Sequence, residues 1–276
     1  MTDKLYYRYM PLDQYAITNL YDNTLHFNKA ENFDDPTDCA FSIGAIQPSL
    51  VMNCNMTALY EFCDEQPKHR TDPEFDPFIH HRLLENILKN DVGIACFTKH
   101  QMCKKCGLPT LNPIMLSLYA DKHRGIIVEY SASKTTKIYK VNYGHTYKEF
   151  CFGEIIDSIK LRNKSRKVIL NKKSSKPLLF KFNEWKYQNE YRMFGKPNFS
   201  VPLDKLGLSI KRIFIGCRAE TGLVASLERI AKENKIEIFI LKEPIEHNDK
   251  RRVRILNKKG KELNCKKKCQ LNEDHS

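Results

Sequence analysis

The chain has 276 residues, 41% hydrophobic and 29% charged, a composition typical of globular proteins and unlike that of disordered ones. No apolar run approaches the ~20 residues that cross a bilayer, and the first residues lack a secretory signal. We therefore expect a cytoplasmic protein that binds no membrane. Its ten cysteines are irregularly spaced, which argues against a secreted disulfide scaffold and favours reduced thiols.

The formal net charge of +13 is concentrated in two stretches. Residues 160–181 contain nine Lys or Arg and no acid, and residues 250–268 contain ten Lys or Arg and one acid. The rest of the chain is therefore mildly acidic, and the positive field is local. Such a field attracts phosphate groups, so both stretches predict a nucleic-acid or ribosomal target. The alternative is a solvated surface that only keeps the protein soluble.

The first half of the chain alternates strand and helix patterns. Alternating or compact apolar runs predict strands over residues 4–10, 24–28, 92–98, 125–130 and 137–143. Helical spacing of apolar residues, with Pro at the first position of each segment, predicts helices over residues 11–20, 73–90 and 113–121. Residues 29–38 predict a loop because Asn, Asp and Pro dominate there.

The second half ends in the clearest unit of the sequence. Helices are predicted over residues 148–170, 178–187 and 219–234, and strands over residues 190–194, 208–216 and 235–241. The last strand, helix and strand form one supersecondary unit. Together these patterns predict an α+β fold with a mixed, mainly antiparallel sheet and flanking helices. We expect one domain over residues 1–243 and a basic, flexible tail over residues 244–276.

Common catalytic and cofactor motifs are missing from the sequence. It contains no G-x-S-x-G elbow, no H-E-x-x-H zinc motif and no glycine-rich phosphate loop. Cys103 and Cys106 have CxxC spacing, and Cys265 and Cys269 form a looser pair in the basic tail. Four thiolates could hold zinc, but the pairs lie far apart and their lysine neighbours equally suit reactive surface thiols. A zinc site is therefore not expected.

Four short clusters carry the more informative residues: Tyr6–Tyr9, Leu25–Asn28 with Asn32–Pro36, Ser117–Gly125, and Trp185–Arg192. Arg8 lies within a strand among aromatic residues, where a charge is costly to bury without an anion. Glu190 opens another strand among aromatic neighbours. The two side chains could form a structural ion pair, or each could face a ligand.

The four clusters, in this order, resemble the family called domain of unknown function 2971, which has relatives among bacterial abortive-infection proteins. The resemblance covers residues 5–242 and rests on Tyr7-Arg8-Tyr9, on the Asn32–Pro36 loop and on two longer segments. The matching positions of those segments are Ser117, Tyr119, Ala120, Asp121 and Gly125, then Trp185, Glu190, Tyr191 and Arg192. The chain departs from the family pattern at Leu116, a tryptophan position, and at Gln188, a glutamate position.

The Gln188-x-Glu190 segment also resembles a signature of the ADP-ribosyltransferase fold. This resemblance implies an ADP-ribosyltransferase-like fold with NAD as co-substrate. It implies that Arg8 clamps the NAD pyrophosphate, Glu190 is the catalytic carboxylate and Gln188 addresses the acceptor. Further NAD-binding candidates lie on the first two strands, on the helix after residue 112 and beside Glu190. They are Tyr9, Phe27, Asn28, Ser117, Tyr119 and Arg192.

The leading functional hypothesis is therefore an NAD-dependent ADP-ribosyltransferase-like toxin or phage-defence effector that modifies a protein or a nucleic acid. A toxin would imply a cognate antitoxin as partner. One alternative is a nucleic-acid-binding protein without catalysis, which would use the two basic stretches. Another is a metal-dependent nuclease, whose carboxylates would be Asp34, Asp35, Asp121 and Glu190.

Overall fold

The computed structural model describes residues 4–33, 35, 37–39, 42–43, 56–63, 79–104, 107–146, 149–150, 152–162, 167–242 and 254–257. The chain divides into two compact units, each assembled from separate segments. Unit 1 contains Met1–Leu25, Phe97–Thr136 and Val201–Ser276, and unit 2 contains His26–Cys96 and Lys137–Ser200. Three of the four divisions fall inside the strands β2 (Thr24–Lys29), β4 (Gly93–Thr98) and β13 (Phe199–Pro202), and the fourth lies between residues 136 and 137.

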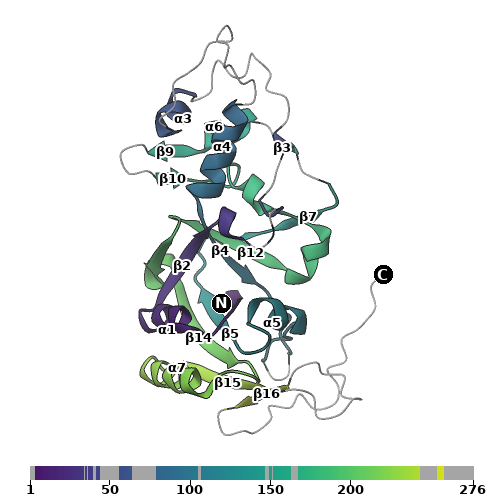
Figure 1. The fold of residues 1–276 in the computed structure, drawn as a ribbon, viewed down its shortest axis with the longest axis vertical. Helices are drawn as coiled ribbons and strands as arrows, with labels where there is room; N and C mark the ends of the chain where they lie inside the picture. Colours follow the sequence, from purple (N-terminus) through teal and green to yellow (C-terminus); the bar gives the residue numbers. More distant parts are fainter. Residues whose placement is uncertain are drawn as a thin grey trace. The chain divides into compact units, whose positions relative to one another are not determined.

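Unit 1 is built on a mixed, mostly antiparallel sheet (Figure 1). Its strands are β1 (Lys4–Met10), the end of β4, β5 (Ile126–Ala132), β14 (Leu208–Ile215), β15 (Glu237–Lys242) and β16 (Arg254–Asn257). The strand β5 pairs antiparallel with β1 on one side and with β14 on the other. The pairing of β14 with β15 is parallel, because a helix connects these two strands.

Three helices and one 3₁₀ turn accompany the sheet of unit 1, namely α1 (Gln14–Tyr21), α5 (Pro113–Tyr119), η5 (Asp204–Leu206) and α7 (Thr221–Glu233). The carboxylate of Asp13 accepts a hydrogen bond from the backbone N–H of Ala16 at 2.7 Å and so caps α1. Asn112 caps α5 in the same way. The helices α1 and α7 pack against each other, and α7 also contacts β15. Every residue of β5 is buried, so this strand is the centre of the unit 1 core.

Unit 2 combines short strands with helices and tight turns (Figure 1). Its helices and 3₁₀ turns are η1 (Ala30–Asn32), α3 (Met56–Cys63), α4 (Ile79–Asn90), α6 (Phe152–Ser158), η3 (Lys176–Leu179) and η4 (Asn183–Gln188). Its strands, besides parts of β2, β4 and β13, are β3 (Ser42–Ile43), β6 (Tyr139–Lys140), β7 (Asn142–Gly144), β8 (Glu149–Phe150), β9 (Lys160–Arg162), β10 (Lys167–Ile169), β11 (Phe180–Phe182) and β12 (Glu190–Gly195).

Four strands of unit 2 are joined in one sheet, in which β4 pairs with β2 and β12, and β12 pairs antiparallel with β6. The strands β9 and β10 form a separate antiparallel pair, while β11 with β7 and β3 with β8 are parallel pairs. A core of buried side chains from α3, α4 and α6 includes Leu59, Phe62, Leu84, Leu88 and Ile155.

The α+β class and the mixed, mostly antiparallel sheet are confirmed. Two predicted helices are wrong. The helix expected over residues 148–170 is the short helix α6 followed by β9 and β10, and the helix expected over residues 178–187 is the turn η3, the strand β11 and the turn η4. The expected tail over residues 244–276 contains the strand β16, which pairs antiparallel with β15. Residues 73–78 of a third predicted helix lie outside the described residues.

Candidate functional site

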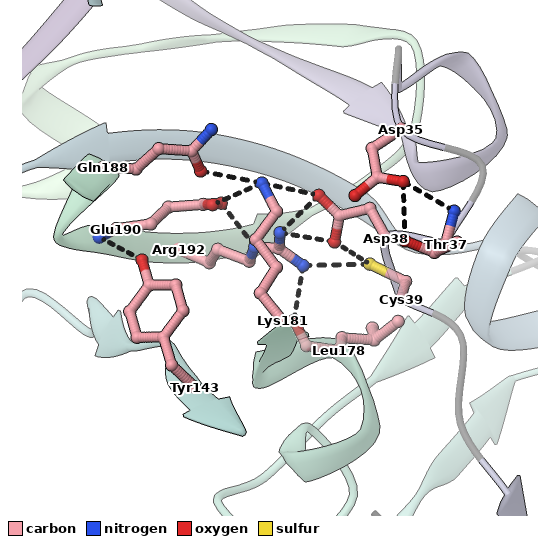
Figure 2. Close-up of polar contacts among 10 residues, drawn as sticks. All are labelled: Asp35, Thr37, Asp38, Cys39, Tyr143, Leu178, Lys181, Gln188, Glu190 and Arg192. Atoms are coloured by element: carbon pink, nitrogen blue, oxygen red, sulfur yellow. Dashed lines mark hydrogen bonds and ion pairs between the residues drawn. The ribbon is translucent and has the colours of Figure 1, made fainter. Parts of the chain in front are cut away.

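Glu190, the predicted catalytic carboxylate, belongs to a cluster of buried charges in unit 2 (Figure 2). Glu190 is 4% exposed. Its Oε1 atom accepts a hydrogen bond from Nε of Arg192 at 2.6 Å, and its Oε2 atom accepts one from Nζ of Lys181 at 2.9 Å. Both carboxylate oxygens are therefore already bound to cations of the same unit.

A second carboxylate, Asp38, closes the cluster from the other side. Nη2 of Arg192 donates to both oxygens of Asp38, at 2.6 and 2.8 Å, and Nζ of Lys181 lies 3.0 Å from Oδ2 of Asp38. Two acids and two cations thus alternate and share their hydrogen bonds. We call these four residues, Asp38, Lys181, Glu190 and Arg192, the charge cluster.

Neutral groups satisfy the remaining donors and acceptors around the charge cluster. Nη1 of Arg192 donates to the carbonyl of Leu178 at 2.8 Å and to Sγ of Cys39 at 2.9 Å. Gln188, the predicted acceptor-addressing residue, receives a hydrogen bond from Nζ of Lys181 at 2.8 Å. The backbone N–H of Glu190 donates to the hydroxyl of Tyr143 at 2.9 Å. These bonds offset much of the cost of burying charge.

Local backbone geometry explains why these side chains meet. Side chains two apart on a strand point to the same face, so β12 presents Glu190 and Arg192 together. Asn189, at φ 43°, has the left-handed conformation that Asn tolerates better than most residues, and it turns the chain from η4 into β12. Lys181 comes from the middle of β11, so three short elements converge on one buried point.

The charge cluster keeps its carboxyl groups ionised. Burial would raise the pKa of Asp38 and of Glu190, but the neighbouring Arg192 and Lys181 hold both pKa values below their usual range. For Lys181, burial would lower the pKa, and the two carboxylates raise it instead. All four groups are therefore charged around neutral pH, and their charges cancel.

The thiols beside the charge cluster stay protonated. Burial raises the pKa of Cys39 to about 12, and it also raises the pKa of Cys96. Because the thiolate is the nucleophilic form of cysteine, neither side chain is suited to nucleophilic catalysis. The arrangement as a whole favours a positioning role, in which the charge cluster fixes residues 37–39 to β11 and β12.

Two further NAD-binding candidates, Phe27 and Asn28, lie on β2 within unit 2. Phe27 is fully buried, and its ring lies where a side chain at Gly195 would have to fit. Asn28 pairs with Ile94 of β4. Phe27 is thus a packing residue of the core. Three predicted site residues of unit 2 do lie together in the structure, namely Gln188, Glu190 and Arg192. Their chemical roles stay predictions.

The other candidates lie in unit 1. Arg8 pairs with Val128 in the β1–β5 register, so the predicted ion pair between Arg8 and Glu190 would join two units and stays a prediction. The hydroxyl of Tyr9 lies 2.8 Å from Nε2 of His100, and Ser117 Oγ lies 3.1 Å from Nε2 of His123. Tyr119 is the last residue of α5.

Unit 1 holds a buried acid that the sequence analysis did not single out. Glu129 on β5 accepts two hydrogen bonds from Arg212, both at 2.7 Å, and one from the hydroxyl of Tyr7 at 2.7 Å. Burial and the contact with Glu129 raise the pKa of Tyr7. The signal available in the sequence was a lone Glu within an apolar run over residues 126–132, because a charge in such a run needs a partner.

The predicted nuclease carboxylates are divided between the two units, and one of them is not described. Asp121 lies in unit 1 and Glu190 in unit 2, Asp34 lies outside the described residues, and Asp35 binds the backbone and hydroxyl of Thr37. Among the described residues, no group of three or more His, Cys, Asp or Glu could hold a metal ion. Three of the four cysteines considered for zinc, Cys106, Cys265 and Cys269, also lie outside the described residues.

The residues that follow α6 directly in the chain form an exposed basic surface of unit 2. The strands β9 and β10 pair antiparallel, with Lys167 opposite Arg162 and Val168 opposite Leu161. Leu161 and Val168 pack against the unit 2 core, whereas Lys160, Arg162 and Lys167 are exposed. We call the pair β9–β10 the basic ribbon, because one face is apolar and packed and the other carries three exposed cations beside the half-buried Ile169.

A second group of cations sits at the base of the basic ribbon. The side chain of Asn171 accepts from the backbone N–H of Lys173 at 2.7 Å and donates to the carbonyl of Ser158 at 3.0 Å. These bonds fix a turn whose Lys172, Lys173 and Lys176 are exposed, and we call it the lysine turn. The ninth cation of residues 160–181, Lys181, is instead buried and neutralised in the charge cluster.

Comparison with known proteins places this chain in no established group. No family model, no curated protein and no solved structure matches it. The resemblance to the domain of unknown function 2971 therefore stays a prediction. Within the ranges that the structure describes, no helix has the length and apolar character needed to cross a membrane.

Proposed function

We propose that this protein binds nucleic acid through the basic ribbon and the lysine turn. The observation that carries the proposal is the cross-strand pair of Arg162 and Lys167 on an exposed face. A surface that places two cations opposite each other, in a stretch of 22 residues without one acid, is suited to an anionic ligand.

Nucleic acid fits this surface better than a small anion or a membrane. Six exposed cations are spread along the basic ribbon and the lysine turn, which matches a ligand with many phosphates in a row. Binding at a membrane surface would also need an exposed apolar face to enter the lipid. Two of the three apolar side chains of the ribbon, Leu161 and Val168, pack against the unit 2 core instead, and the third, Ile169, is half-buried.

The salt dependence of binding tests the proposal. Anisotropy of a labelled 20-nucleotide duplex should show an affinity that falls linearly on a log–log plot with a slope of roughly −5 for six phosphate contacts. Replacing Lys160, Arg162 and Lys167 by Ser should reduce the magnitude of that slope by up to about 3, roughly one for each of these cations that contacts a phosphate.

A matched control uses three exposed lysines of unit 1, namely Lys205, Lys232 and Lys235. Replacing these by Ser removes the same total charge but should leave the slope within about 1 of the parent value. If the two triple variants behave alike, the basic ribbon has no special role and the surface only solubilises the protein.

The ADP-ribosyltransferase-like fold and its NAD-dependent activity stay predictions, supported by the sequence pattern and by the meeting of Gln188 and Glu190 at Lys181. Purified protein with labelled NAD and a lysate tests them. Because Glu190 is buried among charges, the variant Glu190→Gln needs Asp38→Asn as its control. A transferase should lose label transfer with Glu190→Gln and retain it, per folded molecule, with Asp38→Asn. Absence of transfer by the folded parent protein would reject the activity.

A further inference from the structure

The form of nucleic acid can be inferred from the shape and composition of the same surface, an inference that rests on the proposed function. We infer that the basic ribbon binds duplex DNA of the B form by entering its major groove, with the lysine turn on the phosphate backbone. Three features support this inference, namely the width of the ribbon, the residue types along it and the different positions of its two groups of cations.

The first step is shape. Strands of an antiparallel pair lie about 4.8 Å apart, and the major groove of B-DNA, about 12 Å wide, admits a two-stranded ribbon. The pair β9–β10 is such a ribbon (Figure 1), and its cationic face is exposed while its apolar face is packed. The major groove of an A-form RNA duplex is deep and narrow, and side chains cannot read it. A ribbon therefore discriminates between the two duplexes.

The second step is composition. Proteins that bind single strands stack the bases on aromatic side chains along a cationic groove. Residues 160–176 contain no Phe, Tyr, Trp or His. The surface thus offers cations without a stacking platform, as expected for a ligand whose bases stay paired and stacked on one another.

The third step is the difference between the two groups of cations. Arg162 and Lys167 face each other across the ribbon, and both Arg and Lys can donate to the O6 and N7 acceptors of guanine in the major groove. Lys172 and Lys173 lie instead on a turn held by the side chain of Asn171. A fixed turn at the base of the ribbon suits contacts to the phosphates beside the groove, which position a protein without reading sequence.

The test compares three labelled probes of one sequence at one salt concentration, namely a 20-base-pair DNA duplex, the matched RNA duplex and the single DNA strand. We expect the DNA duplex to bind at least tenfold more tightly than either of the others. Methyl green, which occupies the major groove, should displace the protein, and netropsin, which occupies the minor groove, should not.

Two double variants with equal loss of charge separate the two roles. Arg162→Ala with Lys167→Ala should abolish the preference for DNA duplex over RNA duplex. Lys172→Ala with Lys173→Ala should weaken binding to both duplexes by a similar factor and keep the preference. All four side chains are exposed, so both variants should fold, which the thermal transition by circular dichroism checks.

The outcomes distinguish the inference from the proposed function beneath it. Binding of RNA duplex or single strand as tight as that of DNA duplex, or displacement by netropsin alone, overturns the inference and leaves nucleic-acid binding standing. Failure to bind any of the three probes at low salt overturns both.

Discussion

Arg192 is the residue on which the charge cluster depends. Its side chain is fully buried and donates to Glu190, to both oxygens of Asp38, to Cys39 and to the carbonyl of Leu178. Removing one partner of a buried ion pair leaves a charge without compensation, which costs more than the pair contributes. The charge cluster is consequently sensitive to any single change among its members.

Neutralising one carboxylate should show this sensitivity. Asp38→Asn and Glu190→Gln should each lower the free energy of unfolding by about 3 kcal/mol or more, because Arg192 and Lys181 are then buried with too little negative charge. Urea unfolding at pH 7 measures the loss. The control is Glu31→Gln, which removes an exposed pair with Lys29 and should cost well under about 1 kcal/mol. Equal small losses in all three variants would contradict the role of the charge cluster.

The charge cluster also predicts a pH dependence. The folded protein holds the pKa values of Asp38 and Glu190 below those of the unfolded chain. Their stabilisation is therefore complete above the unfolded pKa values of about 4 and is lost as the pH falls through the lower folded values. The difference in unfolding free energy between the parent and Asp38→Asn should be constant from pH 5 to 8 and should shrink below about pH 4. A difference that stays constant down to pH 2 would argue against it.

At the scale of single elements, a tight turn after α5 follows from two glycines. Asp121, Lys122 and His123 all have positive φ angles, between 42° and 70°. A side chain at Gly125 would collide with the carbonyl oxygen of Met10, and one at Gly216 would collide with that of His123. The Asp121–Gly125 part of the third sequence cluster thus has a structural explanation, which is close backbone packing.

Substitution of these glycines should be costly. Gly125→Ala should lower the free energy of unfolding by upwards of about 2 kcal/mol, because the backbone of β1 would have to move. The matched control is Gly222→Ala in α7, where a side chain would meet nothing within 4 Å. That change should raise stability by about 0.5–1 kcal/mol, since Ala favours a helix over Gly. Thermal unfolding of both variants checks the pair, and a neutral Gly125→Ala would refute the packing argument.

Long regular elements were predictable from the sequence, and short ones were not. The predicted strand over residues 4–10 agrees with β1 at both ends, because its sequence is rich in Tyr, which favours strands. The strands β9 (Lys-Leu-Arg) and β10 (Lys-Val-Ile) have three residues each, too few to show a period, so the sequence predicts a helix over this segment. The segment 178–187 is predicted as one helix, whereas the structure has the buried Lys181 in the middle of the three-residue strand β11.

The charge cluster shows the same limit. The pairing of Glu190 and Arg192 on one face of β12 follows from their spacing. Asp38, however, is 154 residues away from Arg192 in the chain, and only the fold reveals that they meet. The spacing of charges within an element can be read from a sequence, whereas the partner from another element cannot.

At the scale of the whole molecule, the chain offers one tryptophan as a local probe. Trp185 lies in unit 2, with Nζ of Lys181 5.3 Å from the centre of its ring. Because β2, β4 and β13 contribute residues to both units, loss of either unit disrupts strands of the other. We therefore expect tryptophan fluorescence and far-ultraviolet circular dichroism to report one coincident unfolding transition in urea. Two separated transitions would show that the units unfold independently.

The interleaved segments of the two units also have a consequence during synthesis. All of unit 2 lies between residues 26 and 200, so it is translated before the last segment of unit 1. The strand β1 leaves the ribosome first but must wait for β5, more than 100 residues later, to pair along its full length. At about 5–20 residues per second this wait is on the order of ten seconds. A nascent chain of this protein thus carries β1 without its full partner while more than 100 residues are translated, and chaperones that bind unpaired strands would meet it there.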